Sequence, residues 1–243
     1  IGYVDNDGTF EITKTYSGEG YPGGETLNFD VTVVTPGAPA VSIIGGEIVS
    51  GSSSATLTVD LPEYAVPGVY EYEITESTDG AAIAGVTYAG TYDLKVTVYY
   101  NNEGKLVCQP ALRSGDGAKT DEIVNTFATG SLSVKKLVDG QFGDRTKEFA
   151  VQVTFNAPAN TTVKNDITYE EDGEIQTILA EGGWTTKTVT IDLRHDETIT
   201  FDGIPSGVTY SVEETDTAAS TDGEGTDYQV TYDGSKTGTI GST

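Results

Sequence analysis

The sequence predicts an all-β protein made of two tandem immunoglobulin-like β-sandwich domains, residues 1–128 and 129–243. Apolar and polar residues alternate with the period of two that is expected of half-buried strands. Turn-forming Asp-Gly and Pro-Gly pairs separate these segments, and no long stretch has the 3.6-residue period of a helix. Short strands with frequent turns are typical of sandwiches. The alternating segments are residues 27–33, 55–61, 92–98, 149–155 and 188–193.

Two short motifs recur in the same order, which indicates a duplicated unit. Residues 10–14 and 132–136 both read apolar-x-apolar-x-Lys. Residues 72–76 and 210–214 both read Tyr-x-aliphatic-x-Glu and follow a Pro/Gly turn. The junction between the two predicted domains therefore falls near residues 128–130.

The bulk composition excludes several classes of function. The 243 residues carry a net charge of −25, which repels nucleic acid and anionic membrane surfaces. No apolar run is long enough for a membrane span, and no basic-then-apolar leader opens the chain. Cys108 is the only cysteine, so we expect something other than a disulfide to stabilise the fold.

The strand pattern points three polar side chains of the first domain into the core. Residues i, i+2 and i+4 of a strand share a face. Lys14 therefore lies on the face of Phe10 and Ile12, Glu76 on that of Tyr72 and Ile74, and Asn125 on that of Ile123 and Phe127. A lone lysine at a strand end usually extends to solvent. Three polar residues that point inward in one domain favour a functional site in the core instead.

An amine, a carboxyl and a carboxamide that are buried together can react. An apolar pocket favours the neutral amine and the protonated carboxyl. Lys14 could then attack the carboxamide carbon of Asn125, while Glu76 polarises the carboxamide and shuttles protons as ammonia leaves. The product is a Lys–Asn isopeptide bond, formed once per chain. This chemistry needs no cofactor and no metal.

These residues resemble the isopeptide-linked domains of streptococcal-type major pilins, which belong to the Cna B-type family. The resemblance implies a lysine on the first strand, an asparagine on the last and a catalytic acid between them. These roles would belong to Lys14, Asn125 and Glu76, and to Lys136 and Glu214 in the second domain. The segments that carry the resemblance are residues 12–14, 67–76, 92–98, 123–126, 132–136 and 207–214.

The second domain departs from the pilin pattern at its end. Residues 228–232 are predicted as its penultimate strand, and none of the last ten residues is Asn. The strand that would carry the acceptor for Lys136 is missing from the sequence. Truncation or omission is favoured over a strand donated by another chain, which stays open. Lys135 points away from Leu132 and Val134 and is the weaker candidate nucleophile.

The resemblance also implies an extracellular shaft subunit at the cell surface, polymerised by a sortase with neighbouring pilin subunits. Lys119 corresponds to the acceptor lysine of that polymer, and an ordinary solvated lysine is an equal alternative. An adhesin built on the same domains is the second functional hypothesis. A glycosidase is a weaker third, because no pair stands out among 38 acidic residues.

The remaining candidate sites are weak. His195 is the only histidine, so a histidine-based triad or a Cys/His zinc site has little to build on. Residues 5–8 resemble a calcium loop, but a turn is the better interpretation. Trp184 is expected in the core or at its rim.

Overall fold

The computed structural model describes residues 2–78, 82–141, 143–215 and 229–242, and no helix occurs in these ranges. The all-β prediction is confirmed, and each of the five alternating segments contributes a strand. The chain divides into two compact units, with the boundary between Phe127 and Ala128. Residues 82–86 group with the second unit, although the sequence analysis placed them in the first domain.

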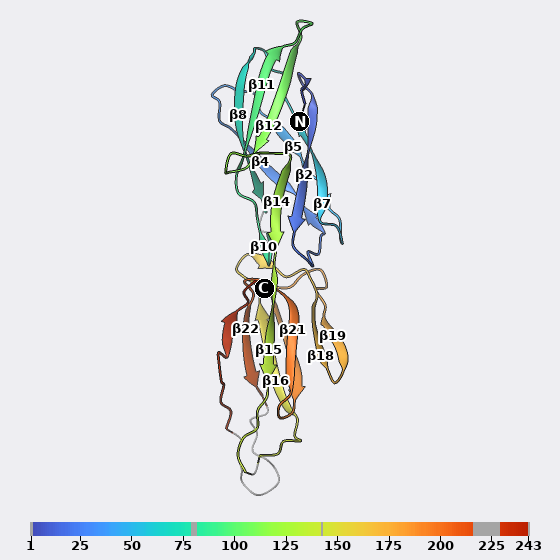
Figure 1. Ribbon diagram of the computed structural model, residues 1–243, viewed down its shortest axis with the longest axis vertical. Coiled ribbons are helices and arrows are strands. Elements are labelled where there is room, and N and C mark those ends of the chain that lie inside the picture. The colour runs from blue at the N-terminus through green and yellow to red at the C-terminus, as the bar shows by residue number, and fades with distance from the viewer. Residues whose placement is uncertain (1, 79–81, 142, 216–228, 243) are drawn as a thin grey trace. The chain divides into compact units, whose positions relative to one another are not determined.

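The first unit is built from two main sheets (Figure 1). One sheet has the order β1-β12-β11-β8-β4, with β13 also paired to β12, and the other has the order β10-β14-β2-β7-β5. The strands of the first sheet are β1 (Val4–Asp5), β4 (Asn28–Val33), β8 (Gly68–Ser77), β11 (Tyr92–Tyr100), β12 (Leu106–Arg113) and β13 (Lys119–Thr120). Those of the second are β2 (Thr9–Ser17), β5 (Ser42–Ile44), β7 (Ser54–Asp60), β10 (Val86–Thr87) and β14 (Glu122–Phe127), and β3 (Glu25–Thr26) pairs separately with β6 (Glu47–Ile48).

The first and last long strands of this unit lie side by side. β14 pairs in parallel with β2, and β2 pairs on its other side with β7 in antiparallel fashion. The end of β14 approaches the turn after β2 closely. A Cβ atom at Gly18 would lie 1.9 Å from the carbonyl oxygen of Phe127, and Gly18 has a φ of +107°. Only glycine permits both this approach and this backbone conformation.

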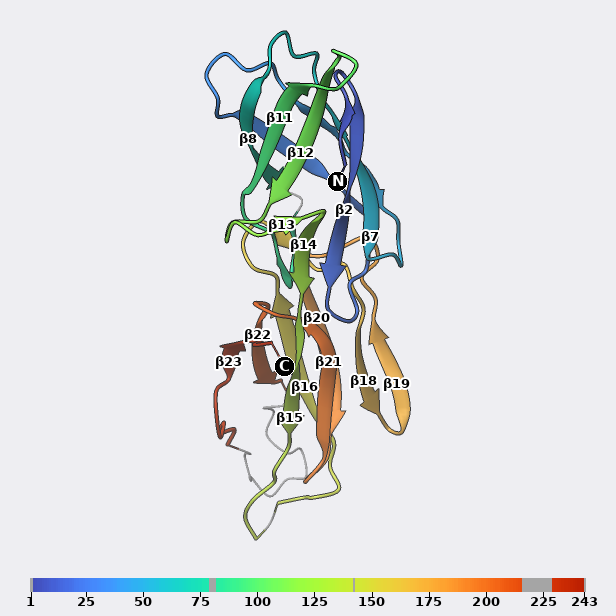
Figure 2. The same ribbon diagram turned by 45° about the horizontal axis from the view of Figure 1, so that its top comes forward.

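The second unit also has two main sheets (Figure 2). Their orders are β15-β21-β18-β19 and β20-β16-β22-β23. The first contains β15 (Thr129–Lys135), β18 (Ile167–Glu171), β19 (Glu174–Ile178) and β21 (Thr198–Pro205). The second contains β16 (Phe149–Asn156), β20 (Thr186–Leu193), β22 (Thr209–Glu214) and β23 (Thr237–Thr239).

Residues 82–86 join the second unit through backbone pairing and apolar burial. β9 (Ala82–Ile83) pairs in parallel with β17 (Thr161–Thr162), and the N–H of Ala84 donates to the carbonyl of Thr162 at 2.9 Å. Ala84 is buried in the same core cluster as Phe155, Phe201 and Trp184. No periodicity in the sequence distinguishes this short segment from a loop of the first domain.

The predicted penultimate strand of the second unit is wrong. Residues 229–232 form no strand, residue 228 lies outside the described residues, and β23 takes the place beside β22. The hydroxyl of Tyr232 accepts a hydrogen bond from the N–H of Glu214 at 2.9 Å, at the end of β22 where a neighbouring strand would bind. A side chain thus replaces a backbone partner there.

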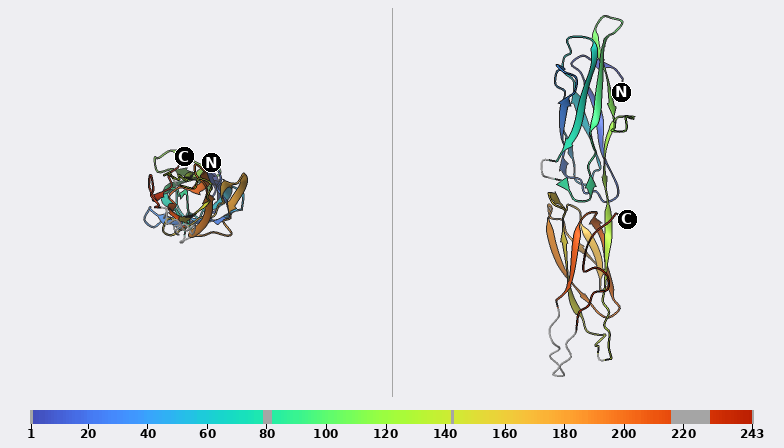
Figure 3. Two further views of the ribbon diagram at one scale, coloured as in Figure 1. Left: turned by 90° about the horizontal axis from the view of Figure 1, so that it is seen from below. Right: turned by 90° about the vertical axis from the view of Figure 1, so that its left-hand side faces the viewer.

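The strand β15 has one free edge within the described part of the chain. It pairs with β21 on one side, and the sheet order gives it no partner on the other. Gly241 lies beside the start of this edge, because a Cβ atom at Gly130 would be 2.2 Å from the carbonyl oxygen of Gly241. The last part of the chain runs close to β15 (Figure 3). In the first unit the corresponding edge, on β2, is occupied by β14.

Candidate functional site

The structure places Lys14, Glu76 and Asn125 in the interior of the first unit, with Lys14 in contact with Glu76 and Asn125 on the neighbouring strand. Lys14 and Asn125 have no exposed surface, and the side chain of Glu76 is 2% exposed. Lys14 lies on β2 and Asn125 on the adjacent β14, where their buried positions follow the predicted alternation. Glu76 lies near the end of β8, in the other sheet of the unit. The site therefore lies between the two sheets.

The amine and the carboxyl are in contact without a hydrogen bond. Nζ of Lys14 is 3.0 Å from Oε2 of Glu76. Both atoms are buried with no hydrogen-bond partner, and so is Nδ2 of Asn125. Buried polar atoms are rarely left unpaired, because each costs about 1–3 kcal/mol. The unpaired atoms include the amine that would attack and the amide nitrogen that would leave.

Burial sets the protonation of the nucleophile. Desolvation lowers the pKa of Lys14, and the nearby Glu76 and Glu25 carboxylates oppose this effect without overcoming it. The neutral amine is the nucleophilic form. Nζ of Lys14 also lies 4.8 Å from the centre of the Tyr16 ring, so its surroundings combine apolar and aromatic groups.

The carboxamide oxygen of Asn125 is held by the backbone. Its Oδ1 accepts a hydrogen bond of 2.6 Å from the N–H of Ala89. Asn125 stands opposite Tyr16 in the parallel register of β14 and β2. The sequence does not indicate Ala89, because a backbone donor in the loop before β11 carries no residue-type signal.

A second buried carboxylate, Glu25, lies beside this site and was also missed. Glu25 is 6% exposed and receives three tyrosine hydroxyls. Tyr16 and Tyr21 donate to Oε2, the latter at 2.8 Å, and Tyr88 donates to Oε1 at 2.8 Å. Burial, reinforced by Glu25, raises the pKa of both Tyr16 and Tyr21, so both remain protonated donors. The short strand β3 that carries Glu25 gave no alternation to read.

The second unit retains the amine and the carboxyl of the predicted site. Nζ of Lys136 donates to Oε2 of Glu214 at 2.7 Å, with side-chain exposures of 16% and 5%. Nζ also lies 4.2 Å from the centre of the Phe149 ring. Lys136 follows the last residue of β15, next to the free edge, and none of the described residues places an Asn where Asn125 lies in the first unit. Lys135 faces outward and pairs with Asp196 at 2.5 Å.

The other residues singled out in the sequence have structural positions. Lys119 is exposed on β13. Nδ1 of His195 accepts the N–H of Val138 at 2.9 Å, and Cys108 is buried. Trp184 belongs to the core of the second unit. Residues 5–8 form a turn after β1, and the described residues contain no group of His, Cys, Asp or Glu suited to a metal ion.

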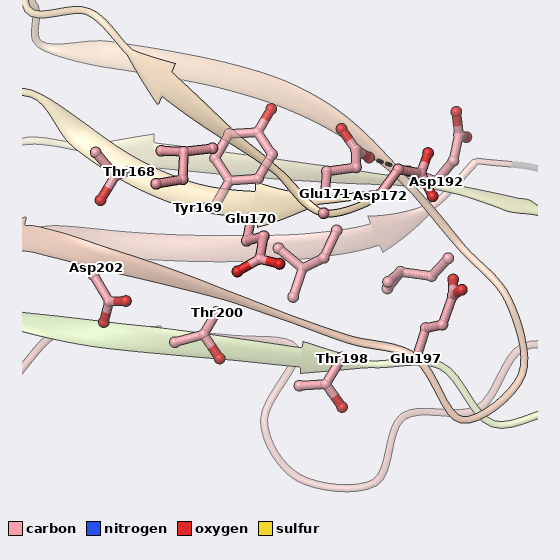
Figure 4. A pocket seen from close by; sticks show the side chains of 14 residues that line it. Thr168, Tyr169, Glu170, Glu171, Asp172, Asp192, Glu197, Thr198, Thr200 and Asp202 are labelled. Carbon is pink, nitrogen blue, oxygen red and sulfur yellow. Dashed lines mark hydrogen bonds between the residues drawn. The ribbon is translucent and has the colours of Figure 1, made fainter.

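An acidic hollow of about 650 Å³ lies in the second unit (Figure 4). Two of its carboxylates accept hydrogen bonds from backbone N–H groups. Oε1 of Glu171 accepts the N–H of Asp192 at 3.0 Å, and Oε2 of Glu197 accepts the N–H of Arg194 at 2.7 Å. The hollow contains no member of the amine, carboxyl and carboxamide sets.

Comparison with known proteins identifies the family to which the first unit belongs. Residues 5–128 match the family described as the Spy0128-like isopeptide containing domain, and the chain belongs to this family. Residues 130–243 match a domain of unknown function. A pilin of Streptococcus pyogenes serotype M1 is 30% identical over 173 residues, which cover 68% of this chain and 50% of that protein. The chain thus spans half the length of this curated relative.

Solved structures share the fold. The crystal structure of the major pilin from Streptococcus pyogenes has a TM-score of 0.56 at 24% identity, covering 87% of this chain and 83% of that one. The T-13 major pilin of the same species has a TM-score of 0.60 at 18% identity, covering 99% and 95%. No helix in the described residues has the length and apolarity to cross a membrane.

Proposed function

We propose that this chain is a structural shaft segment of a Gram-positive surface pilus or stalk, and that its first unit crosslinks itself. The observation that carries this proposal is the buried contact of Lys14 with Glu76, with Asn125 also fully buried on the strand paired with that of Lys14. Lys14 and Asn125 lie near the two ends of the unit's sequence. The extracellular location follows from the same proposal, as does the absence of multiple-turnover catalysis.

The crosslink forms by acyl transfer within the folded unit. The neutral amine of Lys14 attacks Cγ of Asn125 and forms a C–N bond. Glu76 takes a proton from the attacking nitrogen and delivers a proton to Nδ2, which leaves as ammonia. The fold supplies the proximity, since both side chains are fixed at adjacent strands before the reaction starts. Each chain reacts once.

Intact-mass spectrometry of the full chain tests this chemistry. We expect a mass below the calculated value by one ammonia, and a branched peptide that joins Lys14 to Asn125. Lys14→Ala and Asn125→Ala should restore the calculated mass, and Glu76→Ala should prevent or greatly slow the loss. Asn102→Ala changes an exposed asparagine of the same unit and should leave the deficit intact. An unmodified mass for the folded wild-type chain would refute the crosslink.

The second unit contains two of the three groups of the proposed site. Lys136 and Glu214 form the amine–carboxyl pair, and a strand that brings an asparagine to the free edge of β15 would complete it. That strand comes either from the same polypeptide or from a neighbouring subunit. For the 243 residues present here we expect Lys136 to stay unmodified at low concentration. A branched peptide at Lys136 would contradict this expectation.

Polymerisation completes the proposed role. A sortase would join the C-terminal threonine of one subunit to a lysine of the next, and Lys119 is the candidate acceptor because β13 exposes it. In a polymerising host, Lys119→Arg should convert the ladder of covalent multimers to monomers. Lys105→Arg removes another exposed lysine of the first unit and should preserve the ladder. A ladder that survives Lys119→Arg would assign the acceptor elsewhere.

A further inference from the structure

The carboxamide of Asn125 is bound at the atom where charge develops during the reaction. When an amine attacks Cγ, the electrons of the C=O bond move onto Oδ1. That oxygen already accepts the N–H of Ala89 at 2.6 Å, in a place from which water is excluded. A preorganised backbone donor aimed at a developing oxyanion lowers the barrier, because no reorganisation is needed as the charge forms.

The Ala89 N–H is fixed through its neighbour in sequence. The hydroxyl of Tyr88 donates to Oε1 of Glu25 at 2.8 Å, which ties the start of the 88–91 loop to the interior of the unit. Glu25 is itself held at its other oxygen by Tyr16 and Tyr21, whose rings stack at 3.9 Å with an interplanar angle of 10°. A buried carboxylate with three donors is a rigid anchor, and one of these donors, Tyr88, directly precedes Ala89 in the chain.

We propose that the backbone N–H of Ala89 is a catalytic oxyanion donor for the crosslink, and that Glu25 is a positioning residue acting through Tyr88. The inference rests on the proposed Lys14–Asn125 reaction and assigns two groups to it. Attack by the Lys14 nitrogen forms the C–N bond and moves an electron pair onto Oδ1, where the Ala89 N–H binds it. Return of that pair breaks the bond to Nδ2, which leaves as ammonia with the proton delivered by Glu76.

A backbone ester tests the donor without changing any side chain contact. Cell-free translation of the full chain, with lactic acid in place of Ala89, replaces the N–H by an oxygen atom. Samples quenched in denaturant over time give the fraction of chains that have lost ammonia. We expect the rate to fall about 100-fold, as for the loss of one oxyanion donor. Lactic acid in place of Ala118 is the matched control, because that N–H donates to Asp116 in an exposed loop.

Side-chain variants test the positioning role. Tyr88→Phe removes the hydroxyl that reaches Glu25, and we expect about tenfold slower bond formation with the same final extent. Glu25→Gln should slow the reaction in the same direction. Tyr70→Phe removes an exposed hydroxyl bond to the carbonyl of Val66 and should leave the rate unchanged. Because Tyr88 acts through the Ala89 N–H, Tyr88→Phe should add little to the slowing already caused by the ester.

The outcomes separate this inference from the function on which it rests. If the wild-type chain never loses ammonia, the crosslink itself is refuted and the donor role falls with it. If the wild-type chain reacts and the Ala89 ester reacts at the same rate, the donor role alone is refuted. The third outcome concerns the chain that carries both Tyr88→Phe and the Ala89 ester. If its rate is lowered by the product of the two separate factors, Tyr88 does not act through the Ala89 N–H, and its positioning role is refuted.

Discussion

Replacement of Asn125 by alanine should destabilise the first unit far more than the loss of its side-chain contacts alone would, because the crosslink is lost as well. In the Asn125→Ala variant the Lys14–Glu76 contact stays in place, but the covalent link between β2 and β14 cannot form. The link closes a loop that contains nearly the whole first unit, from Lys14 to Asn125. Without it, the unfolded chain regains the conformational freedom that the link removes.

The size of the effect follows from the length of that loop. By the chain-entropy relation used for disulfides, closing a loop of about 110 residues stabilises the fold by about 5 kcal/mol. A unit of about 120 residues has an unfolding entropy near 0.25 kcal/mol per kelvin, so this loss lowers its melting temperature by about 20 °C. Loss of the Asn125 side chain from a buried position adds to the effect in the same direction.

Differential scanning calorimetry of the full chain measures the shift, because the melting of the second unit serves as an internal reference. Lys14→Ala should lower the first transition by a similar amount, and the double variant should lose little more, since both changes remove one bond. Asn102→Ala is the matched control. If the single losses add in full in the double variant, or if Asn125→Ala melts like the wild-type chain, Lys14 and Asn125 are not partners in a crosslink.

Three further predictions follow from the site geometry. In the folded Asn125→Ala chain the pKa of Lys14 lies below its ordinary value of 10.5, so the unfolded chain binds this proton more tightly than the folded chain does. The free energy of unfolding of this variant, measured by urea titration, should therefore rise as the pH increases toward 10.5. The same rise in the crosslinked wild-type chain would contradict a reacted Lys14. Lys136→Ala leaves Glu214 buried without its partner and should lower the free energy of unfolding of the second unit by about 3 kcal/mol in chemical denaturation. Lys135→Ala removes an exposed ion pair and should have no measurable effect. Equal effects of the two variants would show that burial of the pair does not decide the outcome. Reducing agent should leave both melting transitions in place, because Cys108 is the only cysteine, and a transition lost on reduction would contradict a disulfide-free fold.

The period-two rule was informative wherever a side chain sits in the middle of a regular strand. It placed Lys14 and Asn125 on buried faces because sterics leave a strand residue only two directions in which to point. The same rule failed at residues 229–232, where Tyr232 uses its hydroxyl to bind the end of β22 and no ladder forms. Alternation describes which residues could line a face, and it does not say that a partner strand is available.

The groups around the reacting atoms were beyond the reach of sequence patterns. Ala89 contributes through its backbone N–H, which every residue except proline has. Glu25 lies on a strand of two residues, too short to show any period, and only the fold reveals that three tyrosines surround it. The assignment of residues 82–86 to the second unit depends on pairing between segments about 80 positions apart, for which local propensity holds no information.

The parallel pairing of β2 with β14 decides how the first unit would respond to being pulled. The start of β2 and the end of β14 lie at opposite ends of this parallel pair, so traction that reaches these two points slides the strands past each other and loads all their backbone hydrogen bonds at once. With a bond from Lys14 to Asn125, the traction bypasses the intervening strands altogether. The unit would then behave as an inextensible connector in an atomic force microscope, while an uncrosslinked variant would lengthen stepwise.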